Sequence, residues 1–249
     1  MAKLPEIVVS DGKKGINRKV CQYFAMGCGG RIVSCEEAGD NIATFGILRG
    51  TGEVIKKAKN FWYIDHGYMG RSTPPKSMNG YFRIVHNNFW HDGSGNYPSD
   101  RLEEAVPYMF NWRKNGNHIV VVPPSQAMSL YLGLESWLED TIKEIKKYSD
   151  RKIIVTKKSE RGIPEKPLKE HLKNAWVLVT DHSNAAMEAM LRGIPSIMTN
   201  PQRRLSSIKN IENPPLDRSI LNNLAYQQWS LKDMRNGKAW QELKRGNKQ

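Results

Sequence analysis

The sequence lacks any long apolar segment. No stretch of its 249 residues approaches the roughly 20 consecutive apolar residues that cross a bilayer. The amino-terminal residues also lack the apolar core of a secretory signal. We therefore expect a protein without a membrane span, located in the cytoplasm.

Cysteine is scarce. Only Cys21, Cys28 and Cys35 occur, at intervals of seven residues. Three thiols cannot all pair within one chain, no nearby histidine completes a zinc set, and the three straddle a predicted helix and strand. We expect reduced, buried thiols of a cytosolic protein, and no metal site.

Acidic residues are outnumbered. The chain has 38 Lys and Arg against 25 Asp and Glu, a formal net charge of +13. The positive electrostatic field of such a chain attracts polyanions, which include nucleic acids, anionic membrane surfaces and phosphorylated ligands. Solubility alone is the alternative explanation. Part of the excess lies in the carboxyl-terminal residues 244–248.

The clearest pattern of secondary structure covers residues 176–199. An apolar run from Trp176 to Val179 predicts a buried strand, and the strong helix formers from Ala185 to Leu191 predict a helix. Gly193 and Pro195 end that helix before a second strand begins at Ser196. Parallel strands joined in this way place ligands at their carboxyl ends.

Polar segments follow two consecutive predicted strands of this half. Ser183 and Asn184 fall at the helix start, where free N–H groups and the helix dipole favour a phosphate, and Glu188 lies one turn further on the same face. The loop after the strand at residues 152–155 contains three cations, Lys157, Lys158 and Arg161. Together they predict a pyrophosphate site, and a solvated run of charge is the alternative for the lysines.

In the first half, strands alternate with short helices, which predicts a doubly wound parallel sheet. Arg49 begins the glycine-rich loop 49–52, which suits a phosphate or a sugar but lacks the Lys-Ser/Thr ending of a P-loop. The strand 61–65 is followed by an acid, an imidazole, a phenol and a guanidinium: Asp65, His66, Tyr68 and Arg71. The carboxylate or the imidazole could take a proton from an acceptor hydroxyl. Alternatively, both satisfy backbone groups.

The element order in residues 118–200 and the segment from Asp181 to Pro195, DHSNAAMEAMLRGIP, resemble the nucleotide-sugar half of GT-B glycosyltransferases and related sugar epimerases. The resemblance implies an α/β fold of two Rossmann-like domains with parallel sheets. Residues 1–114 would bind the acceptor and residues 115–215 the donor. Residues 216–249 would form helices that cross back to pack on the first domain.

In that superfamily, small residues at the helix start hold the donor diphosphate and the helix glutamate binds the ribose. The resemblance therefore assigns His182, Ser183, Asn184 and Glu188 to donor binding, beside the three cations of the preceding loop. The chain is short for the family and lacks its extended glycine-rich donor loop. It also lacks an acidic DxD triplet, which fits GT-B enzymes because they generally need no metal for the donor.

The resemblance implies a metal-independent, monomeric glycosyltransferase with no cofactor, which moves a sugar from a nucleotide-sugar donor, expected to be UDP-linked, to a hydroxyl. Asp65 or His66 would be the base, and Arg49, Tyr68 and Arg71 would bind the acceptor. The small, basic chain also resembles bacteriophage enzymes that glycosylate hydroxymethylated pyrimidines, which makes duplex DNA the predicted acceptor. The alternatives are a transferase for lipopolysaccharide or another envelope glycan, whose basic face meets anionic lipid, and a non-catalytic nucleic-acid-binding protein.

Overall fold

The structure, a computed structural model, describes residues 4–9, 15–70, 80–106, 108–156, 165–203 and 205–246. Contacts between residues divide the chain into two units, each of which is described by itself. Unit 1 comprises residues 1–91 and 224–249, and unit 2 comprises residues 92–223. The predicted boundary lay between residues 114 and 115, whereas the contacts group residues 92–114 with unit 2.

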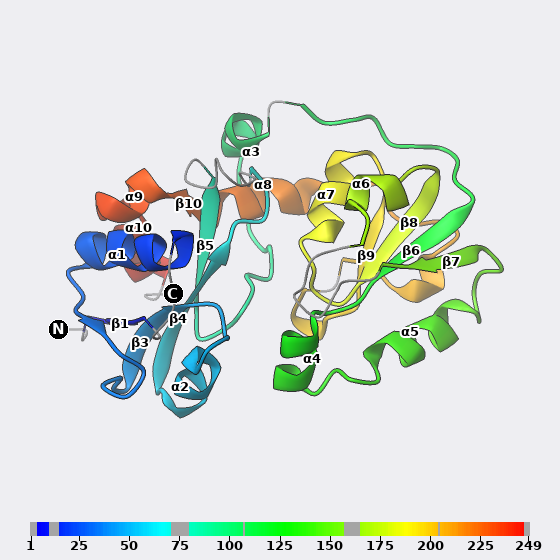
Figure 1. Cartoon of the computed structure of the whole chain (residues 1–249). Helices are drawn as coiled ribbons and strands as arrows, with labels where there is room; N and C mark the ends of the chain where they lie inside the picture. The colour runs from blue at the N-terminus through cyan, green and yellow to red at the C-terminus, as the bar shows by residue number, and fades with distance from the viewer. Residues whose placement is uncertain are drawn as a thin grey trace. The chain divides into compact units, whose positions relative to one another are not determined.

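Unit 1 contains a six-stranded sheet in the order β10-β5-β4-β3-β1-β2 (Figure 1). Four strands are parallel: β1 (Glu6–Val8), β2 (Ile32–Val33), β3 (Asn41–Phe45) and β4 (Asn60–His66). The edge is antiparallel, because β5 (Tyr81–His86) pairs antiparallel with β4, and β10 (Gln228–Ser230) pairs antiparallel with β5. The sheet is therefore mixed, and its last strand comes from the far end of the chain.

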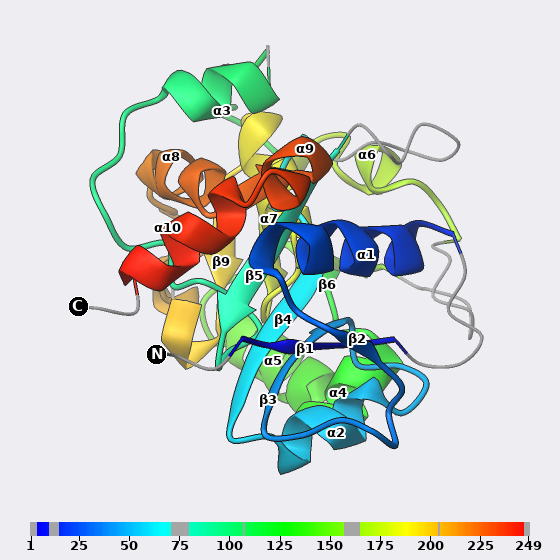
Figure 2. The same ribbon diagram turned by 90° about the vertical axis from the view of Figure 1, so that its left-hand side faces the viewer.

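Helices cover both faces of this sheet. One face carries α1 (Ile16–Cys28), α9 (Leu231–Arg235) and α10 (Lys238–Gly246), which lie side by side in Figure 2. Their apolar side chains, among them Phe24, Met234 and Trp240, form one core with the sheet. The other face packs against α2 (Thr51–Lys57), which contributes Ile55 to a second core cluster.

A glycine sets the distance between α1 and α9. A β-carbon added to Gly27 would lie 1.7 Å from the carbonyl oxygen of Met234, at the end of α9. Only a residue without a side chain lets the two backbones approach so closely. The three helices are thus held in a single close-packed layer.

Unit 2 contains a parallel four-stranded sheet in the order β7-β6-β8-β9. Its strands are β6 (His118–Val122), β7 (Lys152–Val155), β8 (Ala175–Thr180) and β9 (Ser196–Met198). All five residues of β6 are buried, as expected of a strand covered on both faces. The βαβ unit predicted for residues 176–199 is present, with α7 (Ala185–Leu191) between β8 and β9.

The remaining helices of unit 2 surround this sheet. Figure 1 shows α5 (Trp137–Ile145) on one side of the sheet, and α6 (Leu168–His171) and α7 on the other. Trp137 and Ile145, at helical spacing on α5, enter the core with Ile119. The other helical segments are α3 (Asp100–Ala105), α4 (Gln126–Leu132), two short 3-10 helices (Pro201–Arg203 and Ile208–Asn210) and α8 (Ser219–Tyr226), which runs into unit 1.

Candidate functional site

The carboxyl edge of the unit 2 sheet gathers the predicted donor-binding segment. Because its four strands are parallel, the residues that follow β6, β8 and β9 all lie at this edge. After β8 the chain continues as Asp181, His182, Ser183 and Asn184 and then enters α7. This is the position where open α/β sheets bind ligands.

A buried carboxylate organises this edge. Asp181 is only 3% exposed, and its Oδ2 atom lies 2.6 Å from Nδ1 of His182. From the segment after β9, Asn200 donates to Asp181 through Nδ2 at 3.2 Å and Thr199 donates through its hydroxyl at 3.3 Å. One carboxylate thus connects the ends of two neighbouring strands.

Further hydrogen bonds fix the same edge. The indole nitrogen of Trp137, on α5, donates to the Thr199 hydroxyl at 2.8 Å. The Thr180 hydroxyl donates to the carbonyl oxygen of Val122 at 2.7 Å and accepts from the Ser183 N–H at 3.3 Å. Sequence analysis missed Trp137, Thr199 and Asn200. The available signal was position, because Thr199 and Asn200 directly follow the last strand of the predicted βαβ unit.

The pKa of Asp181 lies below its ordinary value. Burial alone would raise this pKa, but hydrogen bonds from His182, Asn200 and Thr199 and attraction to His182 outweigh it. The carboxylate therefore stays ionised and holds the Nδ1 side of the imidazole. The ring orientation of His182 is consequently set by Asp181.

The helix start has its own local hydrogen bonds. The Ser183 hydroxyl accepts from the Ala185 N–H at 3.2 Å, while Asn184 is the N-cap residue and makes no side-chain cap bond. Glu188 accepts from Nε of Arg192 at 3.2 Å. Both members of that pair are partly exposed, so the Glu188 carboxylate remains accessible to solvent.

Three predicted donor cations, Lys157, Lys158 and Arg161, lie outside the described residues. The last described residue before them is Thr156, which directly follows β7 and is 8% exposed. Its hydroxyl has no hydrogen-bond partner among the described residues. It is therefore a further polar group at the same sheet edge, because β7 is parallel to β6.

At the end of β4 in unit 1, Asp65 pairs with a buried guanidinium. Nη2 of Arg83 donates to Asp65 Oδ2 at 2.7 Å, and the Tyr63 hydroxyl donates to the same oxygen at 3.1 Å. Arg83 is 5% exposed and also donates to the carbonyl oxygens of His66 and Phe89. Burial would lower the pKa of Arg83, but the charge of Asp65 and the phenols of Tyr68 and Tyr63 raise it overall. The guanidinium therefore stays charged.

The other predicted acceptor residues differ in their surroundings. Tyr68 is buried, and its hydroxyl lies 2.9 Å from Nδ1 of His91 and accepts from the His91 N–H. His66 packs edge-on against Phe45 with ring centroids 5.5 Å apart. Arg49 is exposed, in the loop after β3, with a positive φ of 61°, and Arg71 lies outside the described residues. The Arg83 guanidinium thus contacts the side chains of Asp65 and Tyr68 but only the carbonyl oxygen of His66, whose ring packs against Phe45 and Phe82.

No group of three or more His, Cys, Asp or Glu side chains within the described residues could hold a metal ion. The three cysteines are free thiols, with Cys21 and Cys28 buried and Cys35 partly exposed, and burial raises the pKa of Cys28. No helix among the described residues is long and apolar enough to cross a membrane.

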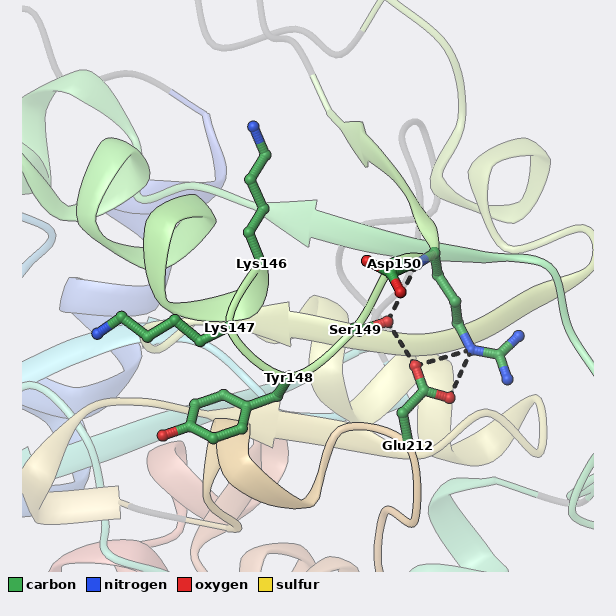
Figure 3. Close-up of a pocket in the computed structure, with 7 residues that line it drawn as sticks. Lys146, Lys147, Tyr148, Ser149, Asp150 and Glu212 are labelled. Atoms are coloured by element: carbon green, nitrogen blue, oxygen red, sulfur yellow. Dashed lines mark hydrogen bonds and ion pairs between the residues drawn. The ribbon is translucent and has the colours of Figure 1, made fainter.

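A shallow pocket of about 510 Å³ lies at the opposite edge of the unit 2 sheet, where β7 begins (Figure 3). Arg151 holds this edge together, because its Nε donates to both oxygens of Glu212 at 3.1 and 3.0 Å, and its Nη1 donates to the Gly116 carbonyl. Figure 3 shows Lys146 pointing upward and Lys147 and Tyr148 pointing to the left, all away from Glu212. Their polar groups do not converge on one ligand position, so we attribute a structural role to this pocket.

No protein-family model matches the chain, and no curated protein matches it in sequence. Solved structures do match in fold. A KpsC β-Kdo 2,4 transferase structure from Thermosulfurimonas dismutans matches with a TM-score of 0.51 and 13% identity, over 90% of this chain and 90% of that chain. A KpsC β-Kdo 2,7 transferase structure from the same organism matches with a TM-score of 0.50 and 10% identity, over 95% and 99%. The α/β, GT-B-like fold expected from the sequence is therefore confirmed.

Proposed function

We propose that this protein is a glycosyltransferase that binds a nucleotide-sugar donor at the carboxyl edge of the unit 2 sheet. The observation that carries the proposal is the buried Asp181 network at that edge, in a chain whose fold matches KpsC transferases along nearly its whole length. A hydrogen-bonded network of this kind fixes a binding surface before the ligand arrives, which reduces the cost of binding.

In this proposal the donor diphosphate contacts His182 and the backbone at Ser183 and Asn184, while Glu188 binds the ribose. Negative charge builds up on the leaving diphosphate as the glycosidic bond breaks. Fixed hydrogen-bond donors therefore stabilise the transition state more than the ground state. Lys157, Lys158 and Arg161 are proposed to add charge to this interaction.

Asp65 and His66 are the two candidates for the base that deprotonates the acceptor hydroxyl. Asp65 is held by Arg83 and Tyr63, so its carboxylate is oriented before an acceptor binds. The same donors stabilise its charge and reduce its tendency to take a proton. Asp65→Asn and His66→Gln separate the two possibilities, because only loss of the base should abolish transfer while leaving donor binding intact.

For the acceptor, we propose an envelope glycan rather than DNA. The two solved structures described above are named as Kdo transferases, and no observation on the described residues favours a DNA base as acceptor. We therefore include nucleotide-activated Kdo in the donor set to be tested, beside UDP-sugars. Sugar transfer to hydroxymethylated DNA, without transfer to glycans, would reverse this preference.

A thermal-shift screen of nucleotide sugars tests the proposed function. A donor present at 100 times its dissociation constant should stabilise the protein by about 2.7 kcal/mol. Ser183→Trp, which places a bulky side chain at the helix start, should abolish that shift. Lys146→Ala, at the opposite edge of the same sheet, should leave it unchanged. If no nucleotide sugar shifts the melting temperature, the proposal is wrong.

A further inference from the structure

The outer surface of the three-helix layer in unit 1 carries a concentration of positive charge. We name this surface the α1–α9–α10 face and define it by the exposed side chains of those helices. Seven of them are basic: Arg18, Lys19, Lys232, Arg235, Lys238, Lys244 and Arg245. The same helices contain only two acidic residues, Asp233 and Glu242. The face therefore carries a large share of the net charge.

The two acids offset only part of this positive charge. Asp233 is engaged at the start of α9, where it forms a capping box with Ser230 and lies 3.8 Å from Lys238. The Glu242 carboxylate accepts from the indole nitrogen of Trp229 at 3.4 Å. Within the described part of the chain, no carboxylate forms an ion pair with the other six cations.

The cations are arranged on a rigid support. Lys19 and Arg235, from different helices, both lie over the ring of Tyr23, at 5.7 and 5.9 Å from its centroid. Beneath them the helices pack through the Gly27 contact and through the apolar core of unit 1. The three helices that carry these exposed cations lie side by side (Figure 2).

Exposed apolar side chains accompany this charge. Met26 lies on the outer side of α1 and is 60% exposed. Leu4 is 50% exposed, and its Cδ1 atom lies 3.7 Å from where a β-carbon on Gly29 would stand, just past the end of α1. Cations beside exposed apolar groups are the composition of surfaces that bind the headgroup region of a bilayer.

We propose that the α1–α9–α10 face docks on an anionic phospholipid membrane, with the cations at the headgroups and Met26 in the interfacial layer. Each basic residue near such a surface contributes to binding. A nucleic acid is the less favoured partner, because the aromatic rings of this face are not available for stacking on bases: Tyr23 lies under two cations, and Trp240 is 6% exposed.

This inference rests in part on the proposed function, because docking on a membrane would bring the transferase to a membrane-anchored acceptor. Because β1 runs toward the carboxyl edge of its sheet and α1 follows β1, α1 begins at that edge. Asp65, at the end of the parallel strand β4, lies at the same edge. The membrane-facing helix therefore starts at the same edge of the unit 1 sheet at which β4 ends with the candidate base, which suits an acceptor glycan anchored in a lipid layer.

Vesicle co-sedimentation tests the proposal. The intact protein should bind vesicles of phosphatidylcholine with about 30% phosphatidylglycerol, and binding to phosphatidylcholine alone should be at least about tenfold weaker. Binding to the anionic vesicles should also fall steeply between 0.05 and 0.5 M salt, because salt screens these charges. Equal binding to both kinds of vesicle, or to neither, overturns the proposal.

Matched charge variants locate the surface. Arg18→Gln, Lys232→Gln, Lys244→Gln and Arg245→Gln combined should weaken binding to anionic vesicles at least about tenfold. A control with the same change in net charge replaces four exposed lysines of unit 2 by glutamine: Lys143, Lys146, Lys169 and Lys209. The control should bind within about twofold of the parent protein. An equal loss in both variants would show that only overall charge matters.

An uncharged variant tests the apolar part. Met26→Ser should weaken vesicle binding at least about threefold, whereas Leu130→Ser, which alters a residue of unit 2 that is 63% exposed, should not. The proposal is overturned if the parent protein binds duplex DNA but no vesicles. If the four glutamine substitutions on the α1–α9–α10 face also abolish that DNA binding, the partner of the face is a nucleic acid.

The donor thermal shift separates this proposal from the proposed function. The face variant should keep the full shift with nucleotide sugars, since none of its substitutions is in unit 2. If the face variant no longer binds anionic vesicles but keeps its thermal shift with nucleotide sugars, the membrane-docking proposal is confirmed and the transferase proposal is unaffected. Vesicle binding by a protein that no nucleotide sugar stabilises would overturn the transferase proposal alone.

Discussion

At the scale of single residues, Asp181 is the group on which the carboxyl edge of unit 2 depends. It accepts from three side chains on two chain segments while almost fully buried. The sequence indicated His182 and its neighbours as site residues. It did not indicate Asp181 as their common partner, because which strand ends meet depends on the order of strands in the sheet.

Asp181→Asn should therefore lower the free energy of unfolding at pH 7 by about 2 to 4 kcal/mol, since it removes a buried negative charge that three side chains contact. The pKa of Asp181 is lower in the folded than in the unfolded protein. Its stabilising contribution is thus complete above the unfolded value, near 4, and is lost as the pH falls through the folded value. Urea unfolding from pH 7 to pH 2 measures this.

The difference in stability between the parent protein and Asp181→Asn should shrink below about pH 4. Asp150→Asn, at an exposed position in the same unit, is the control and should show little effect. A pH-independent difference would contradict the assignment of the effect to the charge of Asp181.

Arg83 supplies a second prediction. It donates to one carboxylate and two carbonyl oxygens, so Arg83→Met should remove the cationic partner of Asp65, whose side chain is 28% exposed, and one donor to each of the two carbonyl oxygens. We expect a loss of about 2 to 4 kcal/mol in the free energy of unfolding. Arg83→Lys should recover little of this lost stability, because an ammonium group cannot reproduce the planar arrangement of guanidinium donors. Chemical denaturation followed by tryptophan fluorescence gives the values.

The matched control is Arg31→Met. Arg31 pairs with Glu6, but its side chain is 67% exposed, and exposed pairs contribute little. A small effect at Arg83 would mean that Asp65 is stabilised by solvent instead. Sequence analysis could not foresee this pair, since it arises from the antiparallel register that sets Asp65 opposite Arg83.

At the scale of elements, local patterns identified most strands and helices. The helix expected from Ala185 to Leu191 is α7, and the strands expected around it, at residues 152–155, 176–179 and from Ser196, are present. The short strand β10 was not predicted, because the segment around Gln228 was assigned to a helix crossing back to the first domain. Its pairing with β5 joins residues about 145 positions apart, and no local pattern records such a contact.

The contact between α1 and α9 is the point at which an element-scale change should have the largest effect. Gly27→Ala places a β-carbon against the Met234 carbonyl, so the helices must separate. We expect a loss of about 2 to 3 kcal/mol, in spite of the higher helix propensity of alanine. Thermal unfolding, monitored by circular dichroism, measures this difference in stability.

Gln22→Ala, on the exposed side of the same helix, serves as the control and should change stability by less than about 0.5 kcal/mol. If Gly27→Ala is neutral or stabilising, the close approach of the two helices is not required for the fold of unit 1.

At the scale of the whole molecule, unit 1 is built from both ends of the chain and unit 2 from its continuous middle. The part of unit 1 that follows unit 2 contains β10, α9 and α10, which contribute Trp229, Leu231, Met234 and Trp240 to its core. Composition indicated a basic protein, and the resemblance to GT-B transferases implied two domains. It could not indicate how the charge and the core are shared between segments far apart in sequence.

Truncation after Tyr226 should consequently unfold unit 1 and leave unit 2 folded. The expected result in a two-dimensional NMR spectrum is the loss of dispersed signals from residues 15–91, with those of residues 92–223 retained. Truncation after Gly246, which keeps all these elements, is the control. Uniform loss of signals from both units would show that unit 2 does not fold independently.

The split composition of unit 1 also has a consequence for biosynthesis. Its first 91 residues leave the ribosome before unit 2 is made, yet β5 lacks its partner β10 until the last residues are translated. At about 5 to 20 residues per second, this interval lasts roughly 8 to 30 seconds. During that time a nascent chain carries an open strand edge and an uncovered apolar sheet face, both of which are sites for chaperone binding.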